Sequence, residues 1–575
     1  MIKKLWPFVG KYRKYLFLCP LLMVGEVLME TLIPLMMSRI VDVGIANGDL
    51  GYVLKIGGLM ALMAVCSLGF GAGAARYAAV GGAGFAKNLR AGMYHKIQEY
   101  SFYNIDRFST ASLITRLTTD VNNTQNALMM LMRMAVRSPM MLILAACFAI
   151  SINADLALIF TVALPLLGIG MYFIMSRAHP RFEAMLKKYD AMNASVQENL
   201  IAIRVVKAFV REKHEKDKFG ITADDVRAAQ IKAEKLVVIG MPLMQLLVYD
   251  CIVAVLWFGG REIIAGSMLT GELISFISYV TQIMMSMMML AMIFLNLVLS
   301  RASVERIVEV LEETPDIQNG EHPRMRVEEG SVEFDHVCFS YAKESENYVL
   351  SDINVSIRSG ETIGILGGTG SAKSTLVQLI PRLYDVSKGC VRVGGHDVRE
   401  YDVTALRDAV AMVLQKNVLF SGSIRDNLRW GNKDATQEEI EAACRAAQAH
   451  DFIMSFPDGY DTDLGQGGVN VSGGQKQRLC IARALLKKPK IVILDDSTSA
   501  VDTATDARIR QAFREELAGT TTIIIAQRVA SVMDADRIMI LNDGRIADIG
   551  THEELMRRSE IYREVYTSQQ KGSAA

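Results

Sequence analysis

The chain has 575 residues, too many for one hydrophobic core, so we expect two or more domains. Its 62 basic and 62 acidic residues balance, which argues against a nucleic acid or another polyanion as a partner. Hydrophobic residues make up 51% of the chain and the mean hydropathy is +0.23, and both values are high for a soluble protein.

Six long apolar stretches lie in the first 300 residues, and a bilayer core needs roughly 20 apolar residues per helix. They lie near 15–45, 53–85, 128–151, 156–176, 236–265 and 271–299. The long, charged segments 86–127 and 177–235 lack loop residues, so we expect helices that continue past the membrane. Lys and Arg concentrate in these segments and at the N-terminus, which the positive-inside rule therefore places in the cytoplasm. The sequence predicts an all-α polytopic membrane domain over 1–310.

Several polar and methionine side chains lie within the predicted membrane helices. Glu26 and Glu30 are one helical turn apart, and Asp250 lies in the fifth helix. These acids either attract cationic compounds or take part in proton movement, or they pair with an arginine or face a water-filled cavity. The candidate arginines are Arg39, Arg133 and Arg137. The sixth helix carries QIMMSMMMLAMIF, whose methionines suit either a substrate surface or, as we favour, plain packing.

The composition changes after the sixth helix. Residues 311–330 form a charged, polar stretch that we interpret as a linker. From 331 the sequence alternates as strands do, in SVEFDHVCFSY, and later mixes strands with helices, so we expect a cytoplasmic α/β domain over 331–566. The last residues, 567–575, are polar and small, which predicts a disordered tail.

The stretch GETIGILGGTGSAKSTLVQLI reads as a strand, a glycine turn and a helix, and nearly fits the P-loop pattern G-x-x-x-x-G-K-[ST]. Backbone N–H groups of such a loop cradle phosphates. Lys373 would meet the β- and γ-phosphates and Ser374 would hold Mg²⁺, but Ala372 stands where the pattern has glycine. The predicted phosphate site comprises Gly367, Gly370, Ser371, Ala372, Lys373, Ser374 and Thr375.

Two further stretches complete the site. In KIVILDD, a buried strand ends in Asp495, which is placed as the acid that holds Mg²⁺ downstream of a P-loop. The adjacent Asp496 sits where a residue that orients the attacking water is expected. In NVSGGQ, a helix N-terminus offers a second anion site, formed by Ser472, Gly473, Gly474 and Gln475. Two phosphate sites in one domain suggest that the second serves another domain's nucleotide.

These stretches, in this order, strongly resemble the ATP-binding-cassette exporters that fuse six membrane helices to one nucleotide domain. The resemblance implies ATP and Mg²⁺ as cofactors, ATP hydrolysis coupled to translocation in the cell membrane, and two nucleotide domains that close head-to-tail. The resemblance also implies four residue roles. Tyr341 would stack on adenine, and Gln415 would touch Mg²⁺. Asp502 would belong to a loop that contacts the other half of the dimer, and Gln527 would occupy the switch position that is usually His. Segments 102–118 and 194–211 resemble the coupling regions that dock on nucleotide domains.

Three residues depart from the family pattern. The family usually has Glu where this chain has Asp496, Gln527 cannot carry the positive charge of His, and Ala372 adds a methyl group near the phosphates. The signature SGGQ is intact. We therefore expect a degenerate ATP site in one half of a heterodimeric exporter of amphipathic drugs, lipids or peptides. The alternatives are a slow homodimeric lipid flippase and a regulatory ATP-binding membrane subunit.

Overall fold

The structure is a computed structural model that describes residues 2–342, 347–496, 503–516 and 519–573. It divides into two compact units, which we describe separately. The first comprises Met1–Gln98 and Ala111–Glu313, and the second comprises Glu99–Thr110 and Thr314–Ala575. Residues 99–110, which the sequence prediction places in the membrane domain, therefore pack with the second unit instead.

The first unit is helical throughout. Its elements are α1 (Ile2–Leu5), η1 (Trp6–Tyr12), α2 (Arg13–Arg39), η2 (Ile40–Ile45), α3 (Leu50–Gln98), α5 (Thr110–Thr115), η3 (Arg116–Asp120), α6 (Val121–Ile152), α7 (Ala154–Ile201), α8 (Ile203–Ala208), α9 (Glu212–Ala265) and α10 (Thr270–Glu312). Within the described residues, six helical spans are long and apolar enough to cross a membrane, which confirms the six predicted helices.

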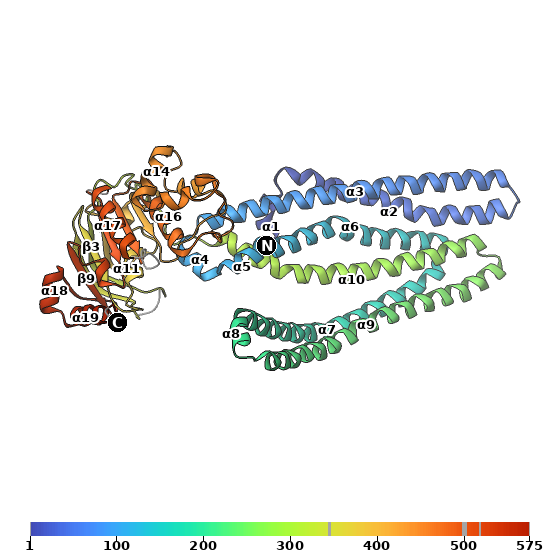
Figure 1. The fold of residues 1–575 in the computed structure, drawn as a ribbon. Coiled ribbons are helices and arrows are strands. Elements are labelled where there is room, and N and C mark those ends of the chain that lie inside the picture. Colours follow the sequence, from blue (N-terminus) through green and yellow to red (C-terminus); the bar gives the residue numbers. More distant parts are fainter. Residues whose placement is uncertain (1, 343–346, 497–502, 517–518, 574–575) are drawn as a thin grey trace. The chain divides into compact units, whose positions relative to one another are not determined.

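The long helices extend beyond the length that a bilayer requires. α3, α7 and α9 have 49, 48 and 54 residues, against the roughly 20 that span a hydrocarbon core. Figure 1 shows α7 and α9 running side by side and joined by the short α8. A buried cluster on α6, α7, α9 and α10 holds this half of the unit together, and the stacked rings of Phe160 and Phe276 lie within it.

The second unit contains two sheets. The antiparallel sheet has the order β2-β1-β4-β5, with β1 (Val332–Phe339), β2 (Leu350–Ile357), β4 (Lys388–Val393) and β5 (His396–Asp397). The other sheet has the order β10-β9-β3-β8-β7-β6, with β3 (Thr362–Leu366), β6 (Val410–Val413), β7 (Ile491–Asp495), β8 (Thr521–Ile525), β9 (Arg537–Asn542) and β10 (Arg545–Gly550). All its pairings except β9–β10 are parallel, so the predicted α/β architecture is confirmed.

Helices pack with these sheets and complete three apolar cores within the described residues. They are α4 (Phe102–Phe108), α11 (Lys373–Gln378), η4 (Val398–Glu400), α12 (Val403–Ala409), α13 (Ile424–Leu428), α14 (Gln437–Ala446), α15 (His450–Met454), η5 (Gly459–Asp461), α16 (Gly473–Leu486), α17 (Thr503–Glu516), η6 (Val529–Ser531), α18 (His552–Arg558) and α19 (Glu560–Ser573). In Figure 1, α18 and α19 lie at one end of this unit, near β9.

The disordered tail predicted for 567–575 is wrong over most of its length, because α19 continues to Ser573. Gln569 explains the difference. Its side chain accepts a hydrogen bond from the N–H of Val529 at 2.9 Å and donates one to the carbonyl oxygen of Gln527 at 2.8 Å. The polar composition of the tail gave no sign of these contacts with the segment that follows β8.

Candidate functional sites

The predicted nucleotide residues meet at one edge of the parallel sheet. Ile365 of β3 pairs with Ile525 of β8, and Ile525 pairs with Asp495 of β7. The carboxyl ends of these three strands are therefore level, and ligands of open α/β sheets bind outside such ends. The P-loop follows β3, Gln527 follows β8, and Asp496 follows β7, so the backbone alone brings the three together.

The P-loop is shaped by two glycines. A Cβ on Gly367 would lie 2.2 Å from the carbonyl oxygen of Leu541, so no other residue fits there. Gly370 has φ +86°, which favours glycine. Inside the loop, the Lys373 ammonium donates to the carbonyl oxygens of Gly367 and Gly368 at 2.9 and 2.7 Å. Burial lowers the pKa of Lys373, so an anionic phosphate would be a better partner than these neutral carbonyls.

Ala372 is the weak position of the loop. Its backbone is left-handed, with φ +71° and ψ +23°, immediately before the first residue of α11. This conformation costs an L-residue roughly 1–2 kcal/mol and is free for glycine. The departure from the glycine pattern therefore stores strain at the point where the loop enters the helix.

We expect Ala372→Gly to stabilise the folded second unit by up to about 1 kcal/mol, because the strain that it relieves exceeds the roughly 0.4–1 kcal/mol of added unfolded-state entropy. Thermal unfolding of the full-length protein should show Tm rising by about 2–4 °C. The control is Ala442→Gly at an exposed position of α14, which should destabilise by about 1 kcal/mol. An unchanged or lower Tm in Ala372→Gly would contradict the strain.

Ser374 and Asp495 form a pair suited to Mg²⁺. The Asp495 carboxylate is 4% exposed, and burial raises its pKa while a hydrogen bond from Ser374 opposes the rise. A buried carboxylate is costly unless a cation offsets its charge. Hydroxyl and carboxylate oxygens are the ligands that Mg²⁺ prefers. The two residues therefore fit a magnesium ion, which would neutralise charge between bound phosphates.

The two unusual residues of the site are bonded to each other. The side-chain amide of Gln527 donates to Oδ2 of Asp496 at 2.9 Å. The Asp496 backbone is left-handed, at φ +47°, and its carbonyl oxygen accepts from the amide of Gln477 at 3.1 Å. Sequence reasoning missed Gln477, which is almost completely buried. These contacts hold Asp496 beside Gln527.

Tyr341 stands at the other side of the P-loop helix. Its hydroxyl and Oγ1 of Thr375 are 3.0 Å apart, which ties the ring to α11. Phe339 and Tyr384 contact it edge-on, with ring centroids 4.9 and 5.3 Å away. The side chain is 42% exposed. Tyr341 therefore belongs to a fixed aromatic group that leaves part of its surface open to a base.

The signature residues begin helix α16. Ser472 is the N-cap: its hydroxyl accepts from the N–H of Gln475 at 3.3 Å, and the Gln475 side chain accepts from the N–H of Ser472 at 2.8 Å. This capping box fixes the first turn. Gly473 and Gly474 follow at the positive end of the helix dipole, where an anion is stabilised.

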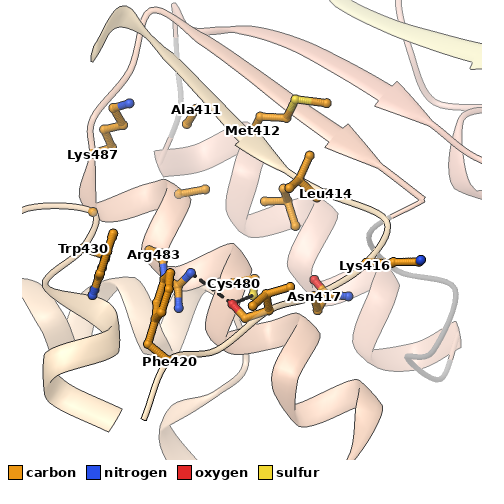
Figure 2. Close-up of a pocket in the computed structure, with 14 residues that line it drawn as sticks. Ala411, Met412, Leu414, Lys416, Asn417, Phe420, Trp430, Cys480, Arg483 and Lys487 are labelled. Atoms are coloured by element: carbon orange, nitrogen blue, oxygen red, sulfur yellow. Dashed lines mark hydrogen bonds between the residues drawn. The ribbon is translucent and has the colours of Figure 1, made fainter. Parts of the chain in front are cut away.

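A groove of about 310 Å³ lies between the chain after β6 and helix α16 (Figure 2). Phe420 and Trp430 stack at 4.2 Å in its wall, and Arg483 lies over the Phe420 ring. Gln415 is exposed in the segment between Leu414 and Lys416, both of which line the groove. The last predicted residue, Asp502, lies outside the described residues.

Arg137 decides the pairing of the intramembrane acids. Its Nη1 donates to Glu26, and its Nη2 donates to both oxygens of Glu30 at 2.8 and 2.9 Å. The interpretation as an ion pair therefore holds for these two acids, and sequence alone did not select among three arginines. Asp250 is exposed on α9.

A cavity of about 490 Å³ with both apolar and polar lining groups adjoins Arg137 between α6 and α10. It is lined by Arg137, Ser138, Met141, Ser278, Thr281, Gln282, Met285, Ser286 and Met289. Ser278, Thr281 and Ser286 each donate their hydroxyl hydrogen to a carbonyl one turn back, so they offer the cavity lone pairs. Met284, by contrast, is fully buried in the helix core, so the methionine run divides between packing and cavity.

Known proteins match this arrangement. The family model described as "ABC transporter transmembrane region" matches residues 16–287, and the one described as "ABC transporter" matches residues 350–499. The uncharacterized ABC transporter ATP-binding protein YfiB of Bacillus subtilis is 37% identical over 568 residues, which cover 99% of this chain and 98% of YfiB. The chain belongs to the ABC transporter family.

A further relative and a solved structure are also similar to this ABC transporter chain. A multidrug efflux ATP-binding/permease protein of Mycobacterium bovis is 34% identical over 478 residues, which cover 83% of this chain and 40% of that protein. The fold matches a bacterial Atm1-family ABC exporter with ATP bound, at a TM-score of 0.83 and 24% identity, over 97% of this chain and 99% of the other. The ABC transporter is thus a half-transporter and a multi-pass membrane protein, with a cytoplasmic ATP-binding domain whose ATP hydrolysis is coupled to transport.

Proposed function

We propose that this half-transporter is the degenerate-site subunit of a heterodimeric exporter. The observation that carries the proposal is the hydrogen bond between Asp496 and Gln527. In a competent site the acid after the Mg²⁺-binding Asp polarises the attacking water. Here one oxygen of a carboxylate that is one methylene short already accepts from an amide that cannot become charged.

The placement of the shorter acid has an energetic consequence. A carboxylate about 1 Å out of place can lower a rate by about 10²-fold. Moving Asp496 toward a phosphate would also break its bond with Gln527 and alter a left-handed backbone. ATP would therefore bind at this P-loop, through Lys373, Ser374 and Asp495, and be hydrolysed slowly.

The signature helix supports the second half of the proposal. Ser472 and Gln475 complete a capping box, and the positive end of α16 has no departure from the pattern SGGQ. In a head-to-tail pair, this helix would complete the ATP site on the partner's P-loop. A poor site beside an intact signature is the combination expected of a subunit that supports hydrolysis on its partner.

We infer an amphipathic substrate from the cavity between α6 and α10. Its α10 wall offers hydroxyl lone pairs, and the side-chain oxygen of Gln282 is buried without a hydrogen bond among the described residues. A ligand with N–H or O–H donors would satisfy these acceptors. Met285 and Met289 offer adaptable apolar contact for the rest of such a molecule. The Mycobacterium bovis relative, a multidrug efflux protein, agrees with export.

We propose roles for the two coupling regions from the contacts of α4 and the exposure of the segment at α8. α4 packs in the second unit, where Asp106 accepts a hydrogen bond from the Tyr384 hydroxyl at 2.8 Å and Phe102 lies against the same ring. We assign α4 as the segment that senses its own nucleotide domain. α8 and the residue that follows it present the exposed apolar side chains of Val205 and Phe209, and we assign this segment to the groove beside Gln415 on the partner.

We expect the purified chain alone to hydrolyse ATP at least about 100-fold more slowly than a typical enzyme, whose turnover is on the order of 10 s⁻¹. Steady-state ATPase in proteoliposomes measures this, first for the chain alone and then with a candidate partner half-transporter that carries Glu and His at the positions of Asp496 and Gln527. Coexpression should restore ATPase, and export of an amphipathic dye should then depend on both chains. A turnover of several per second by the chain alone would contradict the degenerate site and favour a homodimer.

A further inference from the structure

An apolar cavity lies at the N-terminal end of the membrane unit. Its volume is about 370 Å³. It is lined by Leu5, Trp6, Val9, Leu16, Phe85, Thr124, Ala127, Leu128, Leu131, Leu297, Ser300, Arg301 and Val304. An apolar cavity of roughly 150 Å³ in another protein stays dry and binds benzene, so this one has room for a flexible hydrocarbon.

The hydroxyl groups that line the cavity need no hydrogen bond from a ligand. The two hydroxyls are already used within their own helices: Thr124 donates to the carbonyl oxygen of Asp120 at 2.8 Å, and Ser300 donates to that of Asn296 at 2.8 Å. Leu5, Val9 and Phe85 are buried among the remaining lining groups. Hydrocarbon is the chemistry that matches such walls.

The first residues of the protein form one side of the cavity because two of their aromatic rings pack against glycines of α3. A Cβ on Gly84 would lie 2.4 Å from the Tyr12 ring, and one on Gly92 would lie 2.3 Å from the Phe8 ring. Between these two glycines, the Asn88 side chain donates a hydrogen bond to the carbonyl oxygen of Phe8 at 2.9 Å. The wall that carries Trp6 is therefore fixed in place by specific contacts.

Basic residues concentrate in the N-terminal segment that forms one wall of the cavity. Five basic residues and no acidic residue occur in the first 25 positions: Lys3, Lys4, Lys11, Arg13 and Lys14. Arg13 lies over the Trp6 ring at 5.7 Å. Arg301 lines the cavity, and its side chain is 71% exposed beside Glu305. Lys4 contacts Glu312, so two acids partly offset the charge. Basic residues at the cytoplasmic face attract anionic lipid headgroups.

We propose that this cavity binds an acyl chain of an anionic phospholipid from the cytoplasmic leaflet. The acyl chain occupies the space between η1, α6 and α10, and the lipid phosphate lies among the N-terminal cations and Arg301. Trp6, 40% exposed, marks the boundary between chain and headgroup, as tryptophan does at membrane interfaces. The site is separate from the cavity beside Arg137, so the inference does not depend on the transported substrate.

Trp6 provides the measurement. The chain has three tryptophans, so Trp257→Phe with Trp430→Phe leaves Trp6 as the fluorophore of the full-length protein. In phosphatidylcholine bilayers, brominated-chain phosphatidylglycerol should quench Trp6 at about fivefold lower mole fraction than brominated-chain phosphatidylcholine. The reference is a protein that keeps only Trp257, which is 69% exposed on α9 and should show no preference between the lipids.

Three variants test where the lipid sits. Ala127→Phe fills the cavity from α6 and Val304→Phe fills it from α10, and each should abolish the preference for the anionic lipid at Trp6. Arg301→Gln leaves the cavity open and should reduce the preference while retaining quenching. Equal quenching of Trp6 by the two lipids would overturn the proposal, as would an unchanged preference in both filled variants, because the lipid would then lie outside the cavity.

Discussion

Gly473→Asp in this chain should lower the ATPase activity of the complex by about 10²-fold or more, since losing one donor to a developing negative charge already costs about that much. Gly473 is the first residue of α16 and is exposed in its own unit. A carboxylate there would face the γ-phosphate bound by the partner and would oppose closure by like-charge repulsion.

Misfolding would not account for such a loss. An acidic residue in the first turn of a helix is stabilised by the helix dipole, so the new carboxylate should leave α16 intact. The control is Gly320→Asp, which adds the same charge where a Cβ meets no atom within 4 Å. ATPase of the reconstituted complex is the measurement, with ATP binding to each chain followed by photolabelling. Near-normal turnover in Gly473→Asp would show that this signature does not serve the active site.

Restoring the family residues should have the opposite effect at this chain's own P-loop. Asp496→Glu with Gln527→His should raise hydrolysis there by about 10²-fold, because the carboxylate regains the reach that one methylene supplies. The double change is needed because Gln527 holds Asp496 by a hydrogen bond at 2.9 Å. Asp496→Glu alone leaves the new glutamate beside Gln527, and Gln527→His alone leaves the new histidine beside the shorter Asp496.

Nucleotide retention gives the measurement for the pair. In the unaltered complex, ATP labelled at this P-loop should persist through several partner turnovers, and in the double variant it should be released as ADP. The two single variants serve as controls and should retain most of the label. An empty P-loop beside an occupied partner site would contradict the proposal, and Ala372, with its strained φ of +71°, would then be the cause.

The predictable part of this protein depends on periodicity and on local pattern. Uninterrupted apolar runs predicted the six spans, and the four apolar residues before Asp495 predicted the fully buried β7. The partner of Glu26 and Glu30 could not be predicted, because three arginines were possible and only the packing of α2 on α6 selects Arg137. Helix α4 was misplaced for the same reason: its docking depends on Tyr384, distant in sequence.

The sequence predicted which residues form the ATP site but not which of them bond to each other. Glycine spacing and the helix start after it located the P-loop. Nothing local to Asp496 indicated Gln527 as its hydrogen-bond partner, because β8 brings the two together across the sheet. The glycine pattern marked Ala372 as a departure, and the structure shows the backbone consequence, a φ of +71°.

Because residues 99–110 belong to the second unit, the chain passes between the units three times rather than once. A fragment excised at Thr314 would lose α4, leaving the Tyr384 hydroxyl without Asp106 and Thr314 without the Asn104 amide. It would also leave the Tyr384 ring without its contact with Phe102. The ATP-binding half cut at the linker is therefore an incomplete folding unit, and gene fusions or proteolytic dissections that treat Thr314 as its start should yield a less stable protein.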